Sequence, residues 1–242
     1  MKYLLYDNIV RGAGLGHTLA CYNYGLQLAR SWDMELLTKK LIPGHGFNSM
    51  MHTTIEQELG IPIVDDEHLD KLFHSNLVEI IPYADHHPVE NDFRSTREIF
   101  KQWYDDADNI LNNRLAKDIT SITISIRRGD LACSDRKHPM RSRLLPLNFY
   151  LDELNRILEH NEIEDYHLTV SCDTRNGTSL VDENNNVLDV EDVFKNHLKH
   201  FTFLPSDMDG EKTFIFFHHA VSSDFFISSN SGFSKIINEV YR

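Results

Sequence analysis

Apolar residues occupy every second position of one segment near the middle of the chain, Ile122-Thr123-Ile124-Ser125-Ile126. This alternation predicts a strand with one buried face. Shorter apolar runs predict further strands at residues 3–6, 35–38, 166–172, 201–204 and 225–228. Longer segments separate these runs, which is typical of a sheet whose strands are parallel.

Apolar residues at helical spacing predict the helices that connect these strands. The clearest helix begins at Leu147, where apolar residues recur at i, i+3, i+4 and i+7. Further helices are expected around residues 19–29, 95–115, 190–200, 211–221 and 233–241. Residues 65–91 are acidic and rich in histidine, with one short apolar run at 77–81. Residues 174–186 are polar, which predicts an exposed excursion.

The predicted strands and helices alternate in two blocks that meet near residues 115–120. Such alternation indicates an α/β protein. We expect two Rossmann-like lobes that face a cleft. The N-terminal lobe would cover residues 1–117 and the C-terminal lobe residues 118–242.

Composition narrows the classes of function. The chain has 242 residues, of which 41% are hydrophobic and 25% charged, as in ordinary globular proteins. Its 37 acidic against 24 basic residues give a net charge of −13, which argues against broad binding of nucleic acid or anionic membranes. Cys21, Cys133 and Cys172 are far apart and match neither a disulfide framework nor a zinc motif. No apolar run predicts a membrane span or signal peptide, so we expect a cytoplasmic protein.

Two adjacent arginines provide local positive charge in this acidic chain. Arg127 and Arg128 follow the alternating strand and precede Gly129. Carboxyl ends of strands hold ligands in open α/β sheets, so the pair predicts a site for a phosphorylated molecule. Neighbouring strand residues point to opposite sides, so we expect one arginine in the site and the other beside a carboxylate. The alternative interpretation is ordinary surface charge.

Polar residues follow two other predicted strands of the same half. Asp173 comes after residues 166–172, where it would accept hydrogen bonds from a base or ribose, or cap the next turn. The segment Ser229-Asn230-Ser231-Gly232-Phe233 follows the last strand and precedes a helix. Free backbone N–H groups make such a start an anion site, and Ser229 and Ser231 add hydroxyl donors. The alternative is ordinary N-capping by Ser231.

Glycines and histidines give weaker signals. Gly12, Gly14 and Gly16 follow the first strand and indicate a loop that approaches a ligand closely, or only a tight turn. Their spacing fits neither the dinucleotide fingerprint nor a P-loop, which disfavours a dehydrogenase. The pairs His86-His87 and His218-His219 diverge in any regular structure, and no metal site is expected from them.

The order of these motifs resembles the fucosyltransferase superfamily, which includes α-1,2-, α-1,6- and protein O-fucosyltransferases. Residues 14–17, Gly-Leu-Gly-His, are similar to the opening Gly-Gly-Leu-Gly-Asn-Gln of α-1,2 enzymes. Residues 127–130, Arg-Arg-Gly-Asp, match the family's His-x-Arg-Arg-Gly-Asp motif, and residues 229–234 resemble its Ser-Asn-Ser-Ser-Phe-Ser motif. Two positions depart from the pattern: Ser125 replaces a histidine, and His17 replaces an asparagine.

The resemblance implies a GT-B-like fold and an inverting, metal-independent glycosyltransferase without a cofactor. GDP-fucose would be the donor, bound by the C-terminal lobe, and a glycan hydroxyl the acceptor. The implied donor-binding residues are Arg127, Arg128, Asp173, Ser229, Asn230, Ser231, Gly232 and Phe233, together with Gly14 and Gly16. Arg128 would contact the diphosphate, and Asp7 and His17 are the candidate catalytic bases. The alternatives are another donor, such as UDP-xylose or a rhamnose nucleotide, and a non-catalytic nucleotide- or glycan-binding module.

Overall fold

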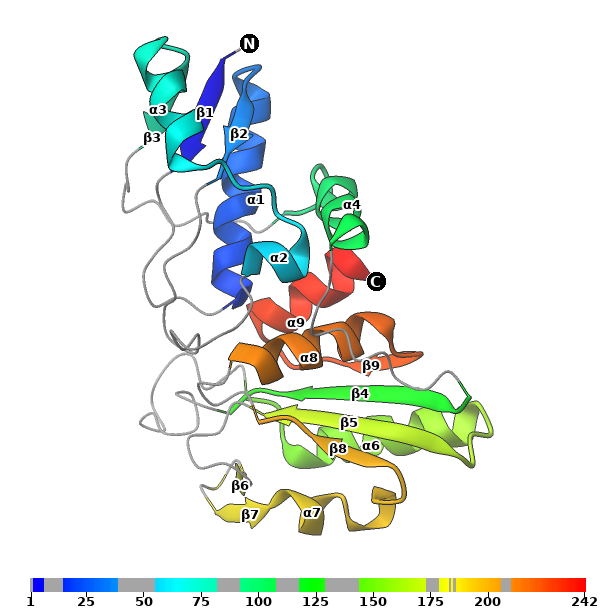
Figure 1. The fold of residues 1–242 in the computed structure, drawn as a ribbon. Helices are drawn as coiled ribbons and strands as arrows, with labels where there is room; N and C mark the ends of the chain where they lie inside the picture. Colours follow the sequence, from blue (N-terminus) through cyan, green and yellow to red (C-terminus); the bar gives the residue numbers. More distant parts are fainter. Residues whose placement is uncertain are drawn as a thin grey trace. The chain divides into compact units, whose positions relative to one another are not determined.

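The computed structural model describes residues 2–6, 15–38, 55–81, 92–107, 118–128, 144–172, 179–182, 184, 186–205 and 210–242. The chain divides into two compact units. The first unit comprises Met1–Ile110 and Glu239–Arg242, and the second comprises Leu111–Asn238. Each unit contains a parallel sheet with helices, so the α/β class is confirmed (Figure 1). The predicted boundary between residues 117 and 118 adjoins a segment outside the described residues and stays a prediction.

The first unit is built on a three-stranded parallel sheet in the order β2-β1-β3. Its strands are β1 (Tyr3–Tyr6), β2 (Glu35–Leu37) and β3 (Val78–Ile81). Leu4 and Leu5 of the central strand are both buried, and Leu5 packs in one apolar cluster with Leu37 and Leu69. The predicted strands at residues 3–6 and 35–38 are confirmed.

Helices of the first unit are α1 (Leu15–Ser31), α2 (Ile55–Leu59), α3 (Asp66–His74) and α4 (Arg97–Asp106). The apolar pattern predicts no helix over residues 55–74. Yet Asp65 caps α3 by accepting a hydrogen bond from the backbone N–H of His68 at 2.6 Å. Leu69 and Phe73, one turn apart, pack toward the sheet. The density of charged residues concealed this short amphipathic pattern.

The second unit contains a four-stranded parallel sheet in the order β8-β5-β4-β9. Its strands are β4 (Thr120–Ile126), β5 (Tyr166–Cys172), β8 (Phe201–Phe203) and β9 (Phe225–Ile227). The two central strands pair over seven residues, from Thr120 opposite Tyr166 to Ile126 opposite Cys172. All four strands lie where the apolar runs predict them.

One face of this sheet forms an apolar core with α6 (Leu147–His160). Ile122, Ile124 and Ile126 belong to this core, and so do Tyr150 and Leu154 of the helix, both fully buried. The predicted helix at residue 147 and the buried isoleucine face are therefore confirmed.

A hairpin and two short helical turns complete this side of the second unit. They are β6 (Ser179–Val181), β7 (Val187–Asp189), α7 (Val190–Val193) and a 3₁₀ turn at Lys195–His197. The helix expected over residues 190–200 is thus shorter than predicted. The exposed excursion expected over residues 174–186 is wrong in part, because β6 pairs with β7 and buries Leu180 in the core. A single apolar pair inside a polar run was too weak a signal.

The opposite face of the sheet carries hydroxyl groups that are also buried. Ser121, Thr123 and Ser125 alternate with the isoleucines of β4 and are at most 7% exposed. Helix α8 (Gly210–Ser222) packs against this face. There the Thr169 hydroxyl is 3.1 Å from Nδ1 of His219. The strand is therefore covered on both sides, as is usual in parallel sheets.

Candidate functional site

Parallel pairing of β4 with β9 brings two sequence motifs to the same edge of the second sheet. Ile122 lies opposite Phe225, and Ile124 lies opposite Ile227. The strands run in the same direction, so the arginine pair after β4 and the serine-rich segment after β9 both follow carboxyl ends. In open α/β sheets this edge is where ligands bind.

Four serine side chains form a cluster at this edge, which we call the serine cluster: Ser125, Ser229, Ser231 and Ser234. Ser125 Oγ and Ser234 Oγ are 2.9 Å apart, although 109 residues separate them in the sequence. Ser229 Oγ lies 2.9 Å from Ser234 Oγ and 3.0 Å from Ser231 Oγ. Ser234 is completely buried, whereas Ser231 is partly exposed. The cluster therefore joins the end of β4 to the segment after β9.

Helix α9 (Gly232–Ile236) begins beside this cluster and continues as a π-helical turn at Ile237–Tyr241. Ser231 caps it, because its Oγ accepts a hydrogen bond from the backbone N–H of Ser234 at 3.1 Å. The N-capping interpretation of Ser231 is thus confirmed. A Cβ added at Gly232 would meet no atom within 4 Å, so there is open space beside this residue. The backbone at Gly232 is accessible to a ligand.

Phe233 packs against α8 through aromatic contacts. Its ring centroid lies 6.1 Å from those of Phe216 and Phe217. Both of those side chains are buried, as is Phe214, so the interpretation of these α8 phenylalanines as core is confirmed. Phe233 itself is only partly buried. It anchors the start of α9 while leaving part of its ring at the surface.

The two arginines after β4 lie in different environments. Arg128 is 1% exposed, and its Nη1 donates a hydrogen bond to the Arg127 carbonyl at 2.9 Å. Arg127 is only partly buried. The guanidinium of Arg128 also acts on Asp182, the residue that follows β6. A buried guanidinium is an organised charge that solvent screens little.

Asp182 is the carboxylate that this charge reaches. Its carboxyl oxygens accept hydrogen bonds from the backbone N–H of Asn184 at 2.8 Å and of Asn186 at 2.7 Å, and from the Asn186 side chain at 2.8 Å. Burial raises the pKa of Asp182, but the Asn186 and Asn184 hydrogen bonds and the charge of Arg128 outweigh it and lower the pKa. The arginine whose charge reaches this carboxylate is therefore Arg128, the one assigned to the diphosphate, and which of the two arginines lies in the site stays a prediction.

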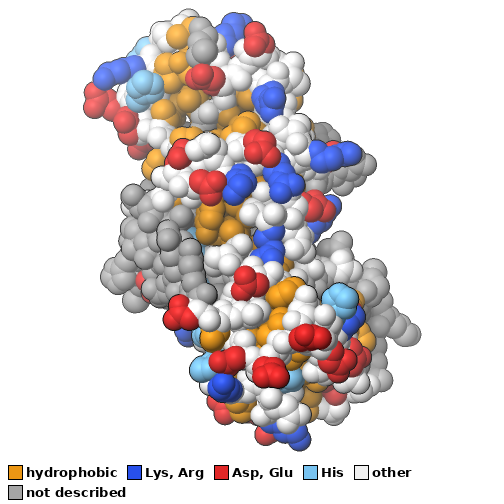
Figure 2. Space-filling model, turned by 90° about the vertical axis from the view of Figure 1, so that its right-hand side faces the viewer, with side chains coloured by type: hydrophobic (Ala, Val, Ile, Leu, Met, Phe, Trp, Pro, Cys, Tyr) orange, Lys and Arg blue, Asp and Glu red, His pale blue; other side chains and the backbone are white. Residues whose placement is uncertain are grey.

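Acidic side chains gather at the other edge of this sheet. Glu159, Glu162, Glu164 and Asp165 lie in or next to the connection from α6 to β5, and all four are exposed. Figure 2, in which Asp and Glu are red, shows acidic side chains close together in the lower part of the view. Lys199 offsets part of this negative charge, because its Nζ lies 2.7 Å from Asp165 Oδ1. The carboxyl edge with its arginines is the more favourable place for a negatively charged ligand.

Of the three glycines predicted in one loop, Gly12, Gly14 and Gly16, only Gly16 is among the described residues. Gly16 belongs to the first turn of α1, so the expectation that it lies in a loop is wrong. His17 follows in the same turn and is partly buried. Asp7, Gly14 and Asp173 lie outside the described residues, and their roles stay predictions.

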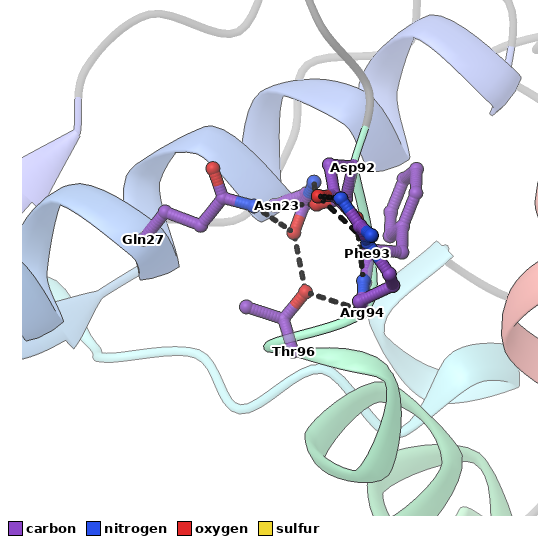
Figure 3. Close-up of polar contacts among 6 residues, drawn as sticks. All are labelled: Asn23, Gln27, Asp92, Phe93, Arg94 and Thr96. Atoms are coloured by element: carbon purple, nitrogen blue, oxygen red, sulfur yellow. Dashed lines mark hydrogen bonds and ion pairs between the residues drawn. The ribbon is translucent and has the colours of Figure 1, made fainter.

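A polar clamp fixes α1 in the first unit (Figure 3). The side-chain amides of Asn23 and Gln27 both donate to the Asp92 carbonyl, at 3.0 and 2.5 Å. The Thr96 hydroxyl donates to Asn23 Oδ1. Asn23 and Thr96 are almost fully buried, so these bonds are shielded from water. The clamp holds the helix that carries Gly16 and His17.

No binding role is predicted from the sequence for Ser125, Ser234 or Asp182. Ser125 stood out only as a departure from the family pattern. A usable signal was present for two of them: Ser125 alternates with isoleucines, and Ser234 follows Ser231 by three residues, the N-cap spacing. The sequence does not connect Asp182 with Arg128. Asp182 lies on the β6–β7 hairpin, and the polar residues 174–186 did not predict that hairpin.

No protein-family model matches the chain, and no curated protein matches its sequence. In the part of the chain that the structure describes, no group of three or more His, Cys, Asp or Glu side chains is placed to hold a metal ion. No helix among those same residues is long and apolar enough to cross a membrane.

Proposed function

We propose that this protein is an inverting, metal-independent glycosyltransferase that transfers fucose from GDP-fucose to a glycan hydroxyl. The observation that carries the proposal is that the arginine pair and the serine cluster both lie at the carboxyl ends of the adjacent parallel strands β4 and β9. Hydroxyls from β4 and from the segment after β9 are in direct contact there. In the proposal, these groups from sequence positions more than 100 residues apart form one anion-binding site.

The chemistry of sugar transfer requires such groups. When the bond from sugar to nucleotide breaks, negative charge grows on the diphosphate oxygens. Donors that are already oriented stabilise this charge without reorganising during the reaction. The guanidinium of Arg128 and the hydroxyls of Ser229 and Ser231 are the donors in the proposal. Arg127 supports them, and Asn230, Gly232 and Phe233 shape the turn around the phosphates.

The remaining roles complete the proposal. Asp173 contacts the nucleoside, and the first unit, with Gly14 and Gly16, completes a GT-B arrangement. Asp7 or His17 accepts the proton of the attacking hydroxyl, as general-base catalysis requires. The protein would act in the cytoplasm, in keeping with the free, buried thiol of Cys21.

Ligand-induced stabilisation tests the proposal directly. Purified protein is titrated with GDP, UDP, GDP-fucose and UDP-xylose in EDTA, and the thermal unfolding temperature is followed. We expect stabilisation by GDP and GDP-fucose. Release of GDP from GDP-fucose in the presence of glycan acceptors then measures transfer.

Each outcome has a distinct meaning. Stabilisation by uridine nucleotides alone would replace the donor. Binding of GDP without turnover on any glycan would indicate a non-catalytic binding module. No stabilisation by any nucleotide or nucleotide sugar would refute the proposed site.

A further inference from the structure

Three histidines gather at the amino ends of β5 and β8, the opposite edge of the second sheet from the serine cluster. His167 lies on β5, His197 ends the 3₁₀ turn at Lys195–His197, and His200 directly precedes β8. All three side chains are partly buried. None of them belongs to the arginine pair or to the serine cluster.

Two of these imidazole rings join the edge of the sheet to β5. Nδ1 of His197 lies 2.6 Å from the hydroxyl of Tyr166, and this contact connects the 3₁₀ turn to the start of β5. Nε2 of His167 lies 2.9 Å from Oγ1 of Thr202, and this contact connects β5 to β8. The side-chain contacts that hold the turn and β8 in place therefore depend on groups that titrate near neutral pH.

β8 is a short strand at the edge of the order β8-β5-β4-β9. It has three residues, and all three side chains are only partly buried. The central strands β4 and β5, in contrast, pair over seven residues. Segments with few buried contacts open locally at a lower free-energy cost than central strands. β8 can therefore open while the rest of the sheet stays closed.

One carboxylate lies within the positive charges of this region. Oδ1 of Asp165 lies 2.7 Å from Nζ of Lys199 and 3.4 Å from Nε2 of His200. Glu162 and Glu164 of the same connection are exposed, so salt screens their charges. Asp165 therefore compensates Lys199 and a protonated His200 before it can compensate any further positive charge.

The surroundings disfavour protonation of the two rings that join the edge to β5. Burial lowers the pKa of His197, and burial together with the charge of His200 lowers the pKa of His167. Helix α8 places His219 on the same side of β5 as His167, and the 3₁₀ turn adds the exposed Lys195. Neither of these groups supplies negative charge. The neutral rings stabilise the closed edge above pH about 6.5, and this contribution is lost as pH falls through the lowered pKa values.

We propose that His167 and His197 form a pH-sensitive latch, which releases β8 and the preceding 3₁₀ turn from β5 when both rings become protonated below pH about 6.5. Opening brings the charged rings into water and separates them from the charges of Lys199 and His200. The central strands and their core with α6 stay in place. The latch is independent of the proposed donor site.

Hydrogen exchange followed by mass spectrometry tests the latch. The reporter is a peptide that includes Leu204, whose N–H donates to the Val170 carbonyl at 2.9 Å. Exchange is measured at pH 7 and pH 5, and the intrinsic rate at each pH is divided by the observed rate to give the protection. We expect the protection of this peptide to fall about threefold or more at pH 5, whereas that of a peptide from β4 stays constant.

His167→Gln/His197→Gln removes both titrating groups and keeps a hydrogen-bonding amide at each position. The edge of this variant should stay closed at both pH values. His74→Gln is the matched control, because His74 is exposed on the last turn of α3 in the first unit. This control should respond to pH like wild type.

Three results would overturn the latch. They are an equal loss of protection in β4, constant protection of the wild-type reporter peptide, and a loss in the double variant as large as in wild type. If the double variant does not fold, His167→Gln and His197→Gln are measured separately. A full wild-type response in both single variants then overturns the latch, and a reduced response in either supports it.

Discussion

Replacement of Arg128 by methionine separates the charge of this side chain from its volume. Arg128 is 1% exposed, so Arg128→Ala would leave a cavity, whereas methionine fills most of the space. A charge-assisted hydrogen bond contributes about 1.5–3 kcal/mol. Since about 1.4 kcal/mol changes a Kd tenfold, Arg128→Met should weaken GDP binding about 10- to 150-fold.

The same substitution has a separate effect on stability. The Arg127 carbonyl loses the Nη1 donor of Arg128, which stands 2.9 Å away. Loss of a donor to a buried carbonyl costs about 1–3 kcal/mol, and this one is only partly buried, so the unfolding temperature should fall slightly. Asp182 also loses a favourable charge, and its pKa should rise. Binding must therefore be measured well below the unfolding temperature of the variant.

Isothermal calorimetry with GDP provides the assay, with Arg127→Met and Arg156→Met in parallel. Arg156 is the matched control, because its guanidinium pairs with Glu153 at 2.7 Å on the exposed side of α6. Arg156→Met should bind GDP like wild type. Binding by Arg128→Met within about threefold of wild type would refute the role of Arg128. Loss of binding in Arg127→Met alone would transfer that role to Arg127.

Three further predictions concern other parts of the molecule. Gly232→Ala should leave the unfolding temperature unchanged, because the added Cβ meets no atom within 4 Å. The same Cβ fills space beside the turn, so GDP binding measured by calorimetry should be weaker. Normal GDP binding would exclude the approach of the ligand to this residue. Leu154→Ala should lower the free energy of unfolding by about 2–5 kcal/mol in urea titrations, because this core side chain is 0% exposed; a loss under about 1 kcal/mol would contradict its packing. Burial lowers the pKa of His167 and of His197, and the charge of His200 adds to the effect at His167. Neutral imidazoles therefore contribute stability above pH about 6.5, the ordinary value, and this contribution is lost as pH falls through the lowered pKa. The unfolding temperature should drop between pH 7 and pH 5, and less so in a His167→Gln/His197→Gln variant; equal drops would contradict the prediction.

Much of the second unit could be predicted because its signals are local. Alternating isoleucines identify β4, and the apolar stripe after Leu147 identifies α6. Weak local signals account for the misses: α3 contains few apolar residues among its charges, and β6 is three residues long. The first unit was harder for this reason.

The candidate site depends on pairing between distant strands, which no local pattern encodes. Ser125 and Ser234 meet only because β9 lies beside β4 in the sheet. Strand order follows from how helices and strands pack together, and the alternation within one strand is compatible with any neighbour. The residue types at the site were therefore predictable, but the contacts among them were not.

One face of β4 carries hydroxyl groups, although apolar side chains would pack there equally well. At its start, Ser121 donates to the Asp224 carboxylate at 2.9 Å and accepts from the Asp224 backbone N–H at 3.0 Å, which fixes the beginning of β9. At its end, Ser125 contacts Ser234. Buried hydroxyls stabilise a fold only when they are paired in defined directions, whereas apolar side chains tolerate small shifts. The polar face thus specifies one position of β9 along β4, and that position holds the serine cluster at the carboxyl edge beside the arginines.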